Sequence, residues 1–67
     1  MDKQIILETA WNTIWNSNSK RVYVGSLSEF TGYEHYFEAL THIRTKAVEY
    51  GYKIKIGVKY ISLVKGE

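Results

Sequence analysis

The last fourteen or so residues alternate between apolar and polar side chains, which restricts them to extended chain. Lys53, Lys55 and Lys59 occupy odd positions of this stretch. Because successive side chains of a strand point to opposite faces, the pattern predicts one apolar and one cationic face. The lysines therefore mark a candidate docking surface. The even positions are apolar except for Ser62: Tyr52, Ile54, Ile56, Val58, Tyr60 and Val64.

This tail can adopt one of two extended conformations, a single long strand or a hairpin. A single long strand passes through Gly57 and leaves Ile61 and Leu63 on the lysine face. A hairpin turning at Gly57-Val58, with glycine first in a two-residue turn, places both residues beside the other apolar side chains. We favour the hairpin for that reason. Its expected cross-strand pairs are Ile54 with Ile61 and Tyr52 with Leu63.

Residues 33–50 have the spacing of an amphipathic helix. Thr31 is the expected N-cap, with Glu34 as its capping-box partner. Gly51 stands where a left-handed C-cap residue belongs. We expect this helix to cover one face of a sheet. The side chains at helical spacing are Tyr33, Tyr36, Phe37, Leu40, Ile43, Ala47 and Val48.

Residues 3–15 fit two kinds of secondary structure. Residues 3–15 place their apolar side chains on one half of a helical wheel, which favours a helix. Their Thr, Ile and Trp content favours strands instead, so a hairpin of residues 10–16 with 20–26 is the alternative. Residues 21–27, which are short, β-branched and aromatic, predict a strand in either case.

These elements predict one small α+β domain over residues 1–67. The expected order is helix, strand, long helix and two strands, with the long helix packed on one face of a small antiparallel or mixed sheet. The alternative order, which starts with the N-terminal hairpin, is β-β-α-β. A chain of 67 residues buries about 60% of its extended-chain surface, so it depends on tight packing of its aromatic side chains.

Composition argues against several function classes. The chain has no cysteine, hence no disulfide or cysteine metal site, and its only aspartate is Asp2. Its glycines form no phosphate-binding motif. The apolar run near the N-terminus is too short for a signal peptide, and no segment approaches the length of a membrane span. We expect a cytoplasmic, non-enzymatic protein without cofactor or membrane association.

One helix face combines imidazole and carboxylate groups. His35, Glu38 and His42 follow one another at spacings of three and four residues. Such groups bind zinc, but no further histidine or cysteine is present to complete a ligand shell. We interpret this face as the solvated side of the helix and expect no metal.

Two sets of residues are candidates for binding. The first is a basic surface with interleaved tyrosines, which suits phosphates and stacked bases. The second is Arg44, whose position falls within the apolar stripe of the long helix, where a charge must be paired or reach solvent. An arginine there is also suited to a phosphate or a partner carboxylate. The basic surface consists of Lys20, Arg21, Lys53, Lys55 and Lys59, interleaved with Tyr23, Tyr50 and Tyr60.

Residues 20–27 (KRVYVGSL), followed by a helix that contains Ala39, resemble the end of AP2-type and integrase arm-binding domains. In that family a strand ending in an aromatic, an aliphatic and a glycine precedes an alanine-containing helix. The resemblance implies a three-stranded sheet whose exposed face enters the major groove of DNA. It covers less than half of the chain, transfers no DNA-contacting residue, and favours the N-terminal hairpin.

Three functional hypotheses follow. The first is a protein-binding regulator or inhibitor of the type that phages and mobile elements encode, whose partner is a host protein. The second is a nucleic-acid-binding module that uses the lysine and tyrosine face on DNA or RNA. The third is a structural subunit that is stable only as an oligomer, with homodimerisation through the C-terminal strand. Heavy use of isoleucine, lysine and tyrosine fits the AT-rich genes of mobile elements.

Overall fold

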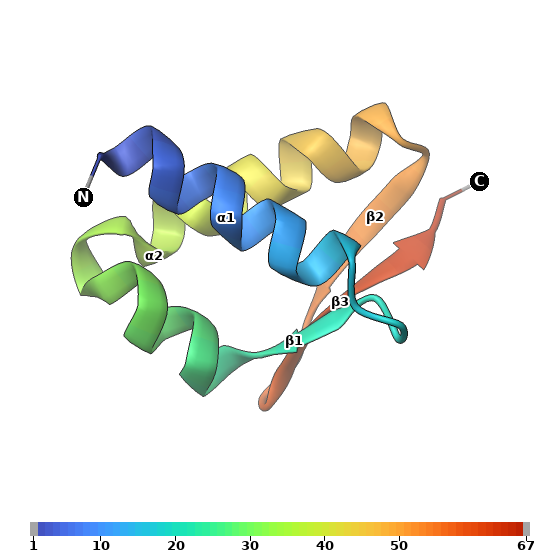
Figure 1. Ribbon diagram of the computed structural model, residues 1–67. Helices are drawn as coiled ribbons and strands as arrows, with labels where there is room; N and C mark the ends of the chain where they lie inside the picture. The colour runs from blue at the N-terminus through green and yellow to red at the C-terminus, as the bar shows by residue number, and fades with distance from the viewer. Residues whose placement is uncertain (1, 67) are drawn as a thin grey trace.

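The protein folds as a helix, a strand, a long helix and two further strands. The computed structural model describes residues 2–66. The predicted α+β class and element order are confirmed, as is the long helix packed on a small antiparallel sheet (Figure 1). The elements are α1 (Lys3–Trp15), β1 (Arg21–Tyr23), α2 (Val24–Glu49), β2 (Tyr52–Ile56) and β3 (Tyr60–Lys65).

The N-terminal segment is helical, so the alternative hairpin, and the order β-β-α-β with it, are wrong. The Asp2 carboxylate caps α1 by accepting a hydrogen bond from the Gln4 amide at 3.3 Å. One face of α1 is buried, and this burial outweighs the strand preference of its Thr, Ile and Trp residues. The buried residues are Ile6, Leu7, Ala10, Trp11 and Ile14.

Strand β1 is shorter than predicted, because the chain turns helical at Val24 instead of after Leu27. Leu27 and Thr31, four residues apart, are both buried. The Ser28 and Thr31 hydroxyls donate to the carbonyls of Gly25 and Leu27, at 3.1 and 3.0 Å. Burial of Leu27 against the core therefore overrides the β-branched composition that predicted a strand.

Helix α2 is divided at Gly32, whose φ of 78° and ψ of 160° are not helical. This region of backbone conformation is essentially restricted to glycine. The chain turns sharply there, so residues 24–31 and 33–49 form two arms (Figure 1). The predicted break at Gly32 is present, but Thr31 does not cap the second arm, because its hydroxyl donates back to Leu27. Gly51 has the predicted positive φ, 83°.

The sheet has the order β1-β3-β2, and both pairings are antiparallel. The tail forms the favoured hairpin, but its register differs from the predicted one. Ile56 lies opposite Ile61 and Ile54 opposite Leu63. Gly57 lacks the positive φ that a glycine-first turn requires, and its amide instead donates to the Tyr60 carbonyl at 2.8 Å. A shift of two residues keeps every side chain on its predicted face.

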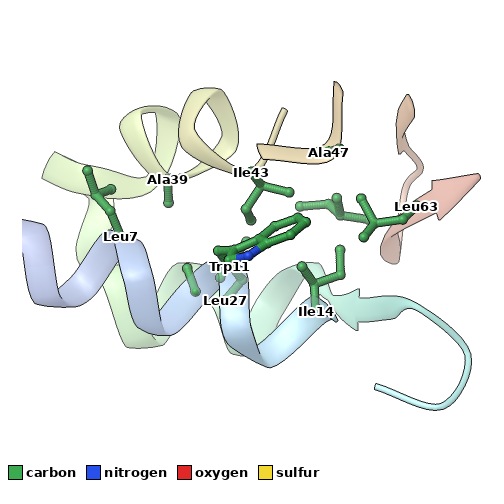
Figure 2. Close-up of a cluster of buried hydrophobic side chains, with 10 residues drawn as sticks. Leu7, Trp11, Ile14, Leu27, Ala39, Ile43, Ala47 and Leu63 are labelled. Atoms are coloured by element: carbon green, nitrogen blue, oxygen red, sulfur yellow. The ribbon is translucent and has the colours of Figure 1, made fainter. Parts of the chain in front are cut away.

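The core lies between the two helices and the inner face of the sheet. In Figure 2 the Trp11 ring lies among side chains that come from both helices and from β3. Alanines at the helix contact let the two backbones approach closely, while Ile14, Ile43 and Ile61 are completely buried. The cluster consists of Leu7, Ala10, Trp11, Ile14, Leu27, Ala39, Ile43, Ala47, Ile61 and Leu63.

Candidate functional site

The outer face of the sheet brings together five of the predicted binding residues. The cross-strand register places Arg21, Ser62 and Lys55 side by side over the three strands. The Arg21 guanidinium lies 4.6 Å from the centroid of the Tyr60 ring, which meets Tyr23 edge-on at 5.6 Å. All five side chains are exposed. We call this surface the outer sheet face: Arg21, Tyr23, Lys53, Lys55 and Tyr60.

Two predicted lysines lie away from this face. The Lys20 ammonium donates to the Trp15 carbonyl at the end of α1 and lies 4.3 Å from the centroid of the Trp15 ring. Lys20 therefore closes the end of α1 and does not present its charge on the outer face. Lys59 is exposed in the turn between β2 and β3, and its carbonyl accepts from the Val24 amide.

Arg44 belongs to a different surface, on the other side of the sheet edge. It lines an open groove between the second arm of α2 and strand β2. Arg44 is exposed, and among the described residues no carboxylate pairs with it. We call this surface the helix–edge groove: Phe37, Leu40, Thr41, Arg44, Val48, Lys53, Ile54 and Ile56.

The helix–edge groove is rich in exposed apolar surface. Phe37, Val48 and Ile56 retain 74%, 66% and 59% of their accessible surface. Leu40 and Ile54 are half-buried between them. Arg44 and Lys53 are the only charged side chains among the groove's described lining residues, so the groove combines apolar walls with positive charge.

The sequence pattern misplaced the apolar groove residues. It assigned Phe37, Val48 and Ile56 to buried faces, because each falls at the correct period. The buried stripe of the second arm is instead Ala39, Ile43 and Ala47. Arg44, within the predicted apolar stripe, is the signal that this stripe meets solvent, since an unpaired charge is not buried at a core position.

The polar side of α2 carries an ion-pair network. Lys3 bonds to Glu38 at 2.9 Å, and His35 Nδ1 lies 3.1 Å from the same carboxylate. The hydrogen bond from Lys3, followed by that from His35, lowers the pKa of the Glu38 carboxyl, and Glu38 in turn raises the pKa of Lys3. His42 Nε2 lies 3.2 Å from Glu8 but outside hydrogen-bond geometry. Over residues 2–66, no group of three or more potential ligands is arranged around a metal site.

No protein-family model, curated protein or solved structure matches this chain. In the part of the chain that the structure describes, no helix is both long and apolar enough to cross a bilayer.

Proposed function

We propose that this chain is a non-enzymatic protein-binding domain, and that its binding surface is the helix–edge groove. The observation that carries the proposal is the exposure of three large apolar side chains, Phe37, Val48 and Ile56, along one groove. Complete burial of a fully exposed side chain of this kind is worth about 1.5–3 kcal/mol, and these three keep more than half of their surface exposed. Contiguous exposed apolar surface on a small protein is characteristic of protein interaction sites.

The positive charge of the groove indicates the kind of protein partner. Arg44 and Lys53 flank the apolar side chains. A guanidinium is well suited to a partner carboxylate, because it offers several donors in a fixed plane. We propose further that this binding makes the chain a regulator or inhibitor of a host protein, a role that small phage and mobile-element proteins often have.

A comparison of matched variants tests this proposal. The tagged chain is used to capture proteins from a lysate of the host cells. The double variant Phe37→Ser/Val48→Ser removes the apolar walls and is expected to lose the dominant captured protein. Tyr33→Ser and Val58→Ser are the controls, because these side chains are 91% and 96% exposed but lie outside the groove. Equal capture by the double variant and the wild type contradicts the proposal.

Nucleic-acid binding is the second candidate function, and the outer sheet face favours it. Lys53, Lys55 and Arg21 offer positive charge beside two tyrosine rings, a combination found at single-stranded nucleic-acid sites. However, Arg21 already lies over one face of the Tyr60 ring. Binding of a labelled oligothymidylate that weakens steeply with salt and is lost in Lys53→Glu/Lys55→Glu supports this candidate.

The arms of α2 also resemble a helix-turn-helix, a motif whose second helix enters the major groove of DNA. The start of the second arm argues against that use here. Its exposed residues include Phe37 and Glu34, and the Glu34 carboxylate would approach DNA phosphates, whereas Glu38 is already paired with Lys3. Repulsion between these charges leaves protein binding as the better-supported function.

Stability only as an oligomer is the third candidate. Homodimerisation was expected through the C-terminal strand, but β3 is the central strand: β2 pairs with it over residues 61–65, and β1 pairs with it over residues 60–62. The free edges belong to β1 and β2, so a second copy would have to add there. A melting temperature that rises with protein concentration supports an oligomer.

A further inference from the structure

Strand β2 has one edge paired with β3 and one edge free, since it ends the order β1-β3-β2. In an antiparallel ladder the bonded pairs alternate along the strand. Two backbone hydrogen bonds just beyond the ends of the β2–β3 ladder, from the Gly57 amide to the Tyr60 carbonyl and from the Gly66 amide to the Gly51 carbonyl, show which pairs are bonded. The amides and carbonyls of Lys53 and Lys55 therefore point towards β3. Those of Tyr52, Ile54 and Ile56 point away from the sheet, towards the free edge.

The helix–edge groove lies directly beside these free backbone groups. Ile54 and Ile56 contribute both to the free edge and to the groove, and the second arm of α2 forms the opposite wall. A strand added to β2 would place every second side chain over this groove, against Phe37 and Val48. The remaining side chains would lie on the outer sheet face, next to Lys53 and Lys55.

Charge decides what kind of strand can add. Antiparallel pairing of two copies of β2 about Ile54 would place Lys53 of one copy opposite Lys55 of the other, and like charges directly opposite are destabilising. Lysines on an edge strand discourage self-pairing in this way. Among the described residues, neither lysine has a carboxylate partner. A strand that carries carboxylates at these positions supplies the missing partners.

We propose that an extended acidic segment of a partner protein adds to β2 as a fourth strand. Its apolar side chains enter the helix–edge groove, and its carboxylates alternate with them to lie beside Lys53 and Lys55. Backbone hydrogen bonds to Tyr52, Ile54 and Ile56 hold the segment in register. This inference rests on the proposed protein-binding function and specifies its partner chemistry.

Peptide binding to the full chain tests the charge requirement. The probe is a short, end-capped, fluorescent peptide of alternating glutamate and valine, compared with the same peptide in which lysine replaces glutamate. We expect the glutamate peptide to bind at least about tenfold more tightly, and the Lys53→Glu/Lys55→Glu variant to reverse this preference. Lys59→Glu is the control for a single charge reversal at an exposed lysine, because Lys59 lies in the turn and not on β2. No binding, or equal binding of both peptides, overturns the proposal.

Hydrogen exchange tests where the peptide binds. In the free protein, the amides of Tyr52, Ile54 and Ile56 should exchange faster than those of Lys53 and Lys55. The glutamate peptide should slow the first three by about tenfold or more. Protection confined to other amides overturns strand addition. Concentration-dependent protection of the same amides without peptide also overturns it, because a second copy then occupies the edge.

A proline at position 56 tests how much the backbone hydrogen bonds of β2 contribute to peptide binding. Ile56→Pro removes an amide that points away from β3, which an edge strand tolerates, whereas Ile56→Val keeps it. We expect only the proline variant to weaken peptide binding, with melting temperatures showing that both variants fold. Equal affinities of the two folded variants contradict the proposal. If peptide tests fail while Phe37→Ser/Val48→Ser still loses a captured protein, strand addition falls and the groove function stands. If both fail, both proposals fall.

Discussion

The two sides of the second arm of α2 differ sharply in solvent exposure, although their residues follow one another along the same helix. On the side that faces α1 and the sheet, Ala39, Ile43 and Ala47 have no exposed surface. On the side that faces the helix–edge groove, Phe37 and Val48 remain mostly exposed. The chain supplies α1 to cover the first side, and no described element covers the second. Apolar spacing therefore identified the helix but did not distinguish side chains that stabilise the fold from those available to a partner.

Truncating one side chain on each side of the second arm of α2 should change the free energy of unfolding by very different amounts. Ile43→Ala removes methyl groups from a completely buried site and is expected to lower the free energy of unfolding by about 2–5 kcal/mol. Val48→Ala, on the open side, should change it by no more than about 0.5 kcal/mol. Urea unfolding measures both. Similar losses for the two variants would contradict the assignment of two distinct faces.

The turn at Gly32 sets the direction of the second arm and therefore the position of the groove. Gly32→Ala is expected to cost about 1–3 kcal/mol of unfolding free energy, because alanine is strained at φ 78° and ψ 160°. No other atom obstructs an added methyl group there, so the cost is one of backbone conformation. Thermal unfolding measures it, and an unchanged melting temperature would show that the turn adopts another conformation.

Two lysines that the sequence assigned to one basic surface should behave differently. Lys20→Met loses the hydrogen bond to the Trp15 carbonyl and the contact with its ring, and is expected to cost about 1–2 kcal/mol. Lys59→Met, in the exposed turn, should leave the unfolding free energy unchanged. Urea unfolding measures the free energy of unfolding of both variants. Equal values would contradict the structural role of Lys20 and would support its assignment to the basic surface.

The smallest expected effect concerns the Lys3–Glu38 pair on the polar side of α2. Because the pKa of Glu38 is lowered in the folded protein, its contribution to stability is lost as pH falls through that lowered value. Because the pKa of Lys3 is raised, its contribution is lost only as pH rises through that raised value. Lys3→Met should therefore lower the melting temperature at neutral pH by roughly 2 °C or less, and its difference from the wild type should disappear in acid. A difference that persists below the folded pKa of Glu38 would contradict this account.

Local patterns predicted much of the fold. The helix over residues 3–15, the positive φ at Gly51 and the hairpin of the tail all depend on neighbours in sequence, and each is present, although the predicted cross-strand pairs of the hairpin are wrong by two residues. The first arm of α2 was missed, because it begins at Val24 after Tyr23, whose side chain makes no capping hydrogen bond that a helix-start pattern would reveal. Its helix depends on burying Leu27, which only the assembled core determines.

The candidate site was harder to predict, because it depends on which faces remain uncovered. The strand pattern correctly placed Lys53 and Lys55 on an exposed face. It could not show that β2 lies at the sheet edge, since strand order depends on where β1 pairs. Nor could it show that α1 covers only one side of α2. Exposure of Phe37 is therefore a property of the tertiary arrangement.

The most direct test of the central claim is the chemical accessibility of position 48. Because the chain contains no cysteine, Val48→Cys and the control Val58→Cys each introduce a single thiol. We predict that both react rapidly with a thiol reagent in the free protein. Bound partner should slow the reaction at position 48 by about tenfold or more and leave position 58 unchanged. Slow reaction of Val48→Cys without partner, or no change when partner binds, would contradict an open groove that receives a protein.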